Sequence, residues 1–329
     1  MTEWPIDWRA VVDEATRRRK QEGLTQTALA ALAGVSRPTV AAFEQGEINL
    51  RFERVVAILD ALGLFVQPGR TDSLQTFVHD ARIRFRELTE KLPEDHPSRQ
   101  PQGHSEQAYS IDGIENLPTL TRLKEIVSHA PKTSGWTPFW VPTKEAIKPS
   151  FHDGLLECWL GKPDVDRVFN DSAHSDFWRI ARDGTAYLRR GYQEDGRDLD
   201  IGTFFDLTLP IYRTAEVLLH AAWLARQLGE SDHGRIRFLG RYTGLAGREL
   251  ISWAKPGLRL ALDERHRARS DSVDLTALTN PHEIETDLER VVGSILRPLY
   301  ERFDGFDAPD ALITGQLSDF RRNLKQFGG

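Results

Sequence analysis

Hydrophobic residues recur three or four positions apart through the first 62 residues, a spacing that places them on one face of successive helices. The pattern predicts four helices, over residues 8–22, 26–33, 36–45 and 51–62. Thr25 and Ser36 precede the second and third of these helices, where N-cap residues belong. Gly34 lies between the same two helices and allows the positive φ of a tight turn. Residues 1–70 are therefore predicted to form an all-α domain that contains a helix-turn-helix.

A second periodic segment predicts a fifth, amphipathic helix over residues 71–92. Its apolar residues alternate at spacings of four and three, at Leu74, Val78, Ala81, Phe85, Leu88 and Leu92. This spacing is typical of a coiled-coil seam, so we predict that the first five residues of the set pair with a second copy of the chain. The alternative is a helix that lies on its own domain. The strand-like residues 64–67 offer another dimer contact, or they pack back on the first domain.

The pattern is interrupted over residues 93–110, where the run PEDHPSRQPQGHS has three prolines, one glycine and almost no apolar side chain. This composition predicts a linker. Strand-like patterns follow over residues 135–141, 155–160, 177–180, 186–192, 235–242, 258–266 and 272–278. Helical patterns cover residues 118–128, 209–228, 281–303 and 309–327. Residues 111–329 are therefore predicted to form a larger α+β domain with a mainly antiparallel sheet.

Composition narrows the class of protein. The chain has 329 residues, a net charge of −6 and a single cysteine, Cys158. One cysteine cannot form an intramolecular disulfide or a cysteine-built zinc site. No apolar run is long enough to span a membrane and no secretory signal is visible, so we expect a cytoplasmic protein. The negative net charge argues against nonspecific coating of nucleic acid.

The first domain carries a recognisable set of residues, namely Gln26, Ala30, Gly34, Val35, Val40, Phe43, Glu44 and Gly46. Together with the predicted helix over residues 51–62, this set resembles the helix-turn-helix of the Cro/C1 repressor family, also called the XRE family. The resemblance covers about residues 8–66. It implies that residues 36–45 lie in the major groove of double-stranded DNA. It also implies that Gln26 and Arg51 hold phosphates.

The predicted recognition helix presents its polar and small residues outward, because Val40 and Phe43 face the core. We predict base contacts from Arg37, Thr39, Ala41 and Ala42. An arginine can pair with guanine, and alanine methyl groups suit thymine. We predict phosphate contacts from Gln26, Ser36, Gln45 and Arg51. The basic run over residues 17–20 touches a flanking phosphate or is a solvated helix end, and the sequence leaves both interpretations open.

In the second domain, an early group of aromatic residues and two arginines offer the walls of a small-molecule pocket. We predict this pocket from Trp136, Trp140, Trp159, Trp178, Arg189 and Arg190. The alternative is that the aromatic residues simply form the core.

Two groups of residues in the second domain are candidates for enzyme chemistry, a possible set of metal ligands and a glycine-rich segment. The residues His174, Asp176, Glu216 and His220 could ligate a metal, but no metalloprotease motif accompanies them. The glycines of GRYTGLAGRE, with Arg241 and Arg248 beside them, match neither a P-loop nor a dinucleotide fingerprint, so a strand-to-helix turn is favoured over an anion site. We therefore predict no catalytic residue, no metal and no cofactor.

The fragments GWTPFWVPT, LLECWLG, AHSDFWR, YLRRGYQED and LRPLYERFDGF resemble a C-terminal module of bacterial proteins that carry other DNA-binding heads, some of them Schlafen-like. This resemblance implies a portable sensor or interaction unit and assigns no residue a role. The leading hypothesis is a dimeric transcriptional regulator, a repressor or autorepressor, that responds to a small-molecule effector or a protein partner. An antitoxin-like autorepressor and an enzyme fused to a DNA-binding head are the alternatives.

Overall fold

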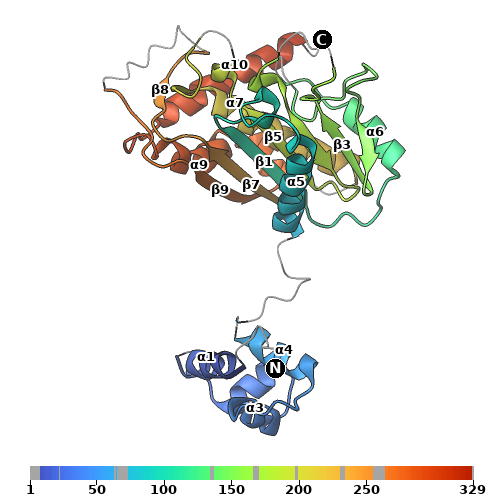
Figure 1. Cartoon of the computed structure of the whole chain (residues 1–329), viewed down its shortest axis with the longest axis vertical. Coiled ribbons are helices and arrows are strands. Elements are labelled where there is room, and N and C mark those ends of the chain that lie inside the picture. Colours follow the sequence, from blue (N-terminus) through green and yellow to red (C-terminus); the bar gives the residue numbers. More distant parts are fainter. Residues whose placement is uncertain are drawn as a thin grey trace. The chain divides into compact units, whose positions relative to one another are not determined.

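The computed structural model describes residues 8–21, 23–62, 64, 73–133, 137–165, 170–196, 199–229, 234–254 and 264–327. The chain divides into two compact units, Met1–Thr76 and Phe77–Gly329, which we call the head and the body (Figure 1). The predicted fold class is confirmed. Helices make up the described part of the head, and the body combines helices with a mainly antiparallel sheet.

The head is built from α1 (Trp8–Gln21), α2 (Gln26–Leu32), α3 (Arg37–Glu44) and α4 (Phe52–Ala61). Its core contains Val12, Ala15, Leu29, Ala30, Val40, Phe43, Val55, Ile58, Leu59 and Leu62. These residues come from all four helices and form a cluster separate from the core of the body. Most of the periodic apolar positions of the sequence are therefore buried in the head, whereas Leu32 and Phe52 are exposed.

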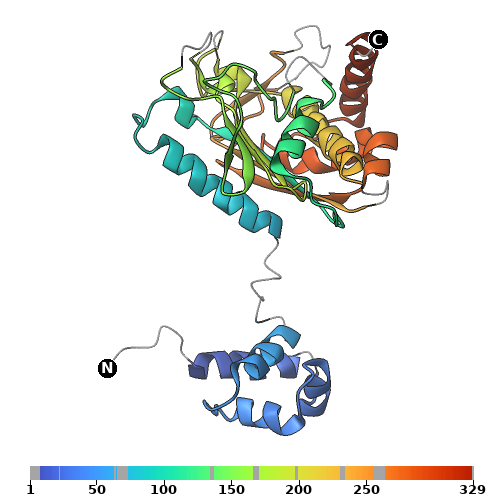
Figure 2. The same ribbon diagram turned by 90° about the vertical axis from the view of Figure 1, so that its right-hand side faces the viewer.

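Helix α5 (Ser73–Thr89) forms as predicted, but its apolar face is buried within the chain. Leu74, Val78, Ala81 and Phe85 are each less than 7% exposed. The Phe85 ring packs against Phe177 of the body at 5.5 Å. The predicted dimer seam along Leu74, Val78, Ala81, Phe85 and Leu88 is therefore wrong for its buried members, because their side chains are covered by their own chain. Helix α5 lies on the body, as the alternative interpretation expected (Figure 2).

The body is organised around a seven-stranded sheet in the order β2-β3-β4-β5-β1-β7-β9, with each neighbouring pair antiparallel. Its strands are β1 (His104–Ile111), β2 (Ser150–His152), β3 (Leu155–Trp159), β4 (Phe177–Ile180), β5 (Ala186–Gly191), β7 (Ile236–Thr243) and β9 (Val273–Thr279). Two further strands, β6 (Phe204–Asp206) and β8 (Glu249–Ile251), pair in parallel as a small second sheet.

Helices cover one face of the large sheet, and α5 lies against the other (Figure 2). The covering helices are α6 (Leu120–Ser128), α7 (Leu209–Gln227), α8 (Pro281–Thr286), α9 (Leu288–Tyr300) and α10 (Asp310–Phe327). Helices α6, α7 and α9 contact the sheet, while α8 and α10 pack on α7 and α9. Because side chains alternate along a strand, each strand contributes to both faces. On β5, Leu188 joins the helix-covered core, whereas Arg189 points towards Phe85 of α5.

The segment predicted as a linker, residues 93–110, is part of the body. Residues Pro97–Arg99 form a short 3-10 helix in which Ser98 is fully buried, and β1 is a central strand of the sheet. Several polar side chains of strand β1 have hydrogen-bond partners in other parts of the body. Gln107, for example, donates to Thr214 Oγ1 at 3.3 Å.

Two other expectations also change. The described part of the predicted strand over residues 135–141 is not a strand, and most of the predicted strand over residues 258–266 lies outside the described residues. The predicted helix over residues 281–303 is two helices, because the backbone leaves the helical region at Asp287 with φ −140° and ψ 42°.

Candidate nucleic-acid interface

The turn between α2 and α3 is fixed by local sequence. Thr25 Oγ1 accepts a hydrogen bond from the Ala28 backbone N–H at 3.0 Å, and Ser36 Oγ accepts one from the Thr39 N–H at 3.4 Å. Between the two caps Gly34 has a φ of +65°, a conformation that glycine adopts without strain. These three residues set where α3 begins and how it leaves the turn.

A carboxylate in the head, that of Glu44 at the end of α3, ties three helices together. Arg19 of α1 donates to both carboxylate oxygens, and Gln26 Nε2 of α2 donates to Oε2 at 2.8 Å. Partial burial raises the pKa of Glu44, but the hydrogen bonds from Arg19 and Gln26 outweigh it and hold this pKa below its usual 4.5. Glu44 is therefore an ionised link that fixes α3 against α1 and α2.

The outward face of α3 carries most of the predicted contact residues. Arg37 and Gln45 are exposed, as is the cap residue Ser36, and Ala41 and Ala42 are half-buried. Thr39 is the exception, because it is only 6% exposed and its hydroxyl lies 2.8 Å from Ser36 Oγ. The predicted base contact by Thr39 is therefore wrong in this geometry. Its hydroxyl belongs to the cap of α3.

The two residues expected to hold phosphates differ in their surroundings. Arg51, immediately before α4, is exposed and free to reach a DNA backbone. Gln26 is half-buried, and one amide hydrogen of its side chain is engaged by Glu44. Its backbone N–H lies at the start of α2, where the first N–H groups of a helix have no partner within the helix. A phosphate contact by Gln26 thus stays a prediction that draws on its backbone and its second amide hydrogen.

The basic run at the end of α1 is less available to DNA than its charge suggests. Arg17 pairs with Glu14 of the same helix, and Arg19 is turned inward to Glu44. The structural role of the Arg19–Glu44 pair was missed in the sequence interpretation. Its signal was an arginine on the packed side of the first helix and a glutamate among the residues that carry the family resemblance.

The pocket predicted from aromatic residues of the body does not form as one site. Trp178 and Arg190 lie on the helix-covered face, where Trp178 is core and Arg190 pairs with Asp176 at 2.8 Å. Trp159 and Arg189 lie on the opposite face of the sheet. This follows because their neighbours along the strand, including Leu188, belong to the helix-covered core, and side chains alternate between the two faces. Trp140 is 43% exposed and accepts a hydrogen bond from Trp178 Nε1 through its carbonyl oxygen. Trp136 lies outside the described residues.

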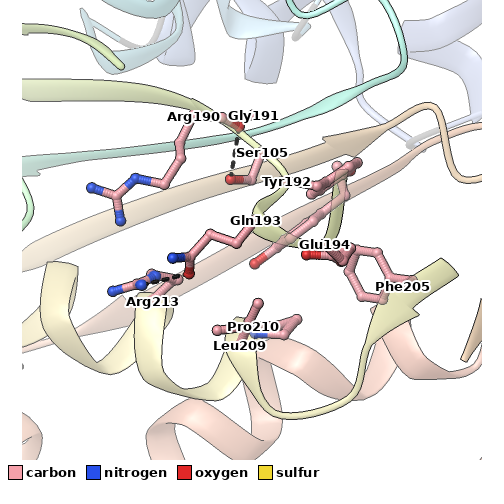
Figure 3. A pocket seen from close by; sticks show the side chains of 11 residues that line it. Ser105, Arg190, Gly191, Tyr192, Gln193, Glu194, Phe205, Leu209, Pro210 and Arg213 are labelled. Atoms are coloured by element: carbon pink, nitrogen blue, oxygen red, sulfur yellow. Dashed lines mark hydrogen bonds between the residues drawn. The ribbon is translucent and has the colours of Figure 1, made fainter. Parts of the chain in front are cut away.

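A small cavity lies where β5 meets the start of α7 (Figure 3). Its volume is about 30 Å³, which is room for about one water molecule and too little for a ligand. Glu194 lines it, and burial raises the pKa of this carboxyl to about 7. Arg213 faces it and donates to Gln193 Oε1 at 2.6 Å. The cavity is therefore too small to be a candidate ligand pocket.

The residues considered for a metal each have a different partner. His174 Nδ1 contacts Asp171 at 2.7 Å, and His220 Nδ1 contacts the Tyr109 hydroxyl at 2.7 Å. Asp176 pairs with Arg190, and Glu216 pairs with Arg213. No cluster of three potential ligands occurs among the described residues.

The glycine-rich segment with Arg248 is a structural corner. The Arg248 guanidinium is fully buried, pairs with Asp195 and donates to the Gly244 carbonyl oxygen at 2.7 Å. Gly244 has a φ of +68°, and a Cβ there would clash with the backbone of Gln102. The segment therefore packs against Gln102 and is linked to Asp195, and it leaves no open anion-binding site at these residues.

In a comparison with known protein families, residues 17–64 match the model of a helix-turn-helix family. This match spans α2, α3 and α4 with the end of α1, and it confirms the resemblance of the head to Cro/C1-type helix-turn-helix domains. It supports a DNA-binding role for the head in transcription regulation. A comparison of the chain with curated proteins found no match. A search of the described helices for a membrane-crossing segment found none.

Proposed function

We propose that the chain is a sequence-specific transcriptional repressor that binds an inverted-repeat operator as a dimer. The observation that carries the proposal is α3, a short helix fixed by two neighbouring helices, with an exposed arginine in its first turn. In helix-turn-helix proteins the second helix of the motif enters the major groove with its N-terminal residues at the base edges. The position of Arg37 as the first residue of α3 supports our assignment of guanine reading to this side chain.

The remaining exposed residues suit the same role. Ala41 and Ala42 are small, which would let α3 approach the base edges, and they offer methyl groups for thymine contact. Ser36, Gln45 and Arg51 flank this surface and supply donors for phosphates, which position the protein without reading sequence.

Dimerisation is part of the proposal, because one short recognition helix reads only a few base pairs. The buried face of α5 is not available for it. The head instead offers Ile48 and Phe52, which are 78% and 75% exposed and follow the recognition helix in the chain. Burying such side chains against a second copy would contribute roughly 1.5–3 kcal/mol each. We assign the contact between heads to these two residues.

The body is proposed to sense an effector or partner that controls DNA binding by the head. Control of this kind requires an effector that binds the DNA-competent and DNA-incompetent arrangements unequally, typically by about 1–3 kcal/mol. A body with its own extensive core and its own cavities is suited to such a role.

The proposal is tested by comparing Arg37→Ala with Arg51→Ala on the preferred duplex and on base-substituted duplexes. We expect Arg37→Ala to lose about 1–3 kcal/mol and to relax preference at one base pair in each half-site. Arg51→Ala should weaken binding to all duplexes alike, because a phosphate contact carries no base preference. An Arg37→Ala protein with an unchanged order of duplex preferences would contradict the assignment of α3.

A further inference from the structure

A cavity of about 440 Å³ opens on the face of the body sheet that carries α5. It lies between α5, the residues around Arg99, and strands β1, β5 and β7. Five arginines line it, Arg82, Arg86, Arg99, Arg189 and Arg241, and they come from four separate segments of the chain. Such a convergence does not arise from one amphipathic helix or one charged loop.

The positive charge of this cavity exceeds the negative charge that faces it. Among the described lining residues Glu106 is the one carboxylate. Arg82 Nε donates to Glu106 Oε2 at 2.8 Å, and Arg189 lies 3.5 Å from Oε1. Among the described residues, the other three arginines form no ion pair with Glu106.

These three arginines keep hydrogen-bonding capacity for a ligand. Arg86 is exposed and has no ion-pair partner among the described residues. Arg99 uses one N–H group to cap the Leu92 carbonyl oxygen at 2.8 Å. Arg241 lies 3.5 Å from Asp274, whose side chain is 68% exposed, so that pair is largely screened by water.

The floor of the cavity is held in place before any ligand arrives. The Arg189 guanidinium lies 4.1 Å from the Phe85 ring centre and donates to Gln100 Oε1 at 2.9 Å. Burial, with the nearby charge of Arg189, lowers the pKa of His104 to about 4, so this histidine is neutral near pH 7. A fixed guanidinium floor loses little conformational entropy on binding.

We propose that this basic pocket binds a small molecule with two or more negative charges, in particular a phosphorylated one. Guanidinium groups match the oxygens of phosphate in a bidentate fashion. The volume lies in the range of small-molecule pockets, about 300–1,000 Å³. The further idea that this small molecule is the effector of the regulator rests on the proposed function. Binding of the anion to the pocket does not depend on it.

Isothermal titration calorimetry of sodium pyrophosphate into the full chain, without DNA, tests the proposal. The variant Arg86→Gln/Arg241→Gln removes two arginines whose side chains are not part of the core. Arg122→Gln/Arg237→Gln is the matched control. Arg237 lies on the same strand and face as Arg241 and also pairs with an aspartate, but it does not line the cavity.

We expect saturable binding to the wild-type chain and to the control, and a loss of at least about tenfold in affinity for the pocket variant, since this variant lacks two charged donors of hydrogen bonds to the anion. Unfolding curves of both variants establish that they are folded. Absence of saturable binding to the wild-type chain, or equal affinity in all three proteins, would overturn the proposal.

Two further measurements separate this proposal from neighbouring ones. If a short random-sequence duplex displaces pyrophosphate from the wild-type chain, and the pocket variant loses affinity for that duplex, the pocket binds a nucleic-acid backbone and the small-molecule assignment is wrong. The Arg37→Ala protein should bind pyrophosphate with wild-type affinity even where its operator preference is lost. Failure of the DNA-binding assignment is thereby distinguished from failure of the pocket.

Discussion

At the scale of single residues, the Glu44 carboxylate stands out because it joins α1, α2 and α3 of the head. We expect Glu44→Ala to lower the free energy of unfolding of the head by about 1–3 kcal/mol, because it removes hydrogen bonds from Arg19 and Gln26 and leaves the half-buried Arg19 guanidinium with no carboxylate partner. Glu14→Ala, which removes an exposed partner of Arg17, is the control and should leave the unfolding temperature unchanged. Equal unfolding temperatures for both variants would show that Glu44 is not a structural link.

A second prediction at this scale concerns Glu194 and pH. Burial raises its pKa to about 7 in the folded body, above the ordinary 4.5, so the folded state binds this proton more tightly than the unfolded chain. The free energy of unfolding should therefore fall as pH rises from about 4.5 to about 7, by about 3 kcal/mol at most, since one pKa unit corresponds to about 1.4 kcal/mol.

Glu194→Gln should remove this decrease, while Glu115→Gln, at an exposed site, should retain it. Burial lowers the pKa values of His104 and His220 and has the opposite effect on stability. These two histidines are present in both proteins, so their effect cancels in the comparison. Parallel pH–stability curves for wild type and Glu194→Gln would contradict the raised pKa.

At the scale of elements, most of α5 belongs to the body, although its apolar residues have the spacing of a coiled-coil seam. Phe85→Ala should lower the free energy of unfolding of the body by about 3–5 kcal/mol, because it removes the ring that packs against Phe177 and Arg189 and leaves a cavity there. The oligomeric mass from light scattering should not change. If the variant became monomeric with unchanged stability, the apolar face of α5 would instead be the dimer interface.

The sequence predicted elements wherever periodicity and caps agreed. The four head helices and α7 follow from apolar spacing, and β4 and β5 follow from the strand-like patterns over residues 177–180 and 186–192. Strand β1 could not be predicted, because its residues are polar and follow three prolines. Glu106 and Gln107 find partners distant in sequence, Arg82 and Thr214.

Candidate DNA-contact residues could be predicted from the sequence, whereas the basic pocket could not. Arg37 was predicted as an outward contact residue from helix geometry, and Arg51 was predicted from the family resemblance; both are exposed. The basic pocket was not predicted, since its arginines converge only when α5 lies on the sheet. Arg189 was named as a pocket residue, but with Arg190, which strand alternation places on the opposite face.

At the scale of the whole molecule, the heads must be paired for an inverted repeat to be read. Phe52→Glu should dissociate the dimer in light scattering and weaken binding to the two-half-site duplex, because it places a charge in the proposed contact between heads. Leu278→Glu is the control, at an apolar side chain 63% exposed on the edge strand β9 of the body. A dimer that survives Phe52→Glu but not Leu278→Glu would assign the interface to the body.

The central claim is that α3 of the head reads a specific DNA sequence. The most direct measurement is selection of bound duplexes from a random-sequence library with the full chain, repeated with Arg37→Ala. We predict enrichment of an inverted repeat whose half-sites lie about one helical turn apart, and loss of one base preference per half-site in the variant. Enrichment of no sequence by the wild-type chain, or of the same sequence by both proteins, would contradict the account.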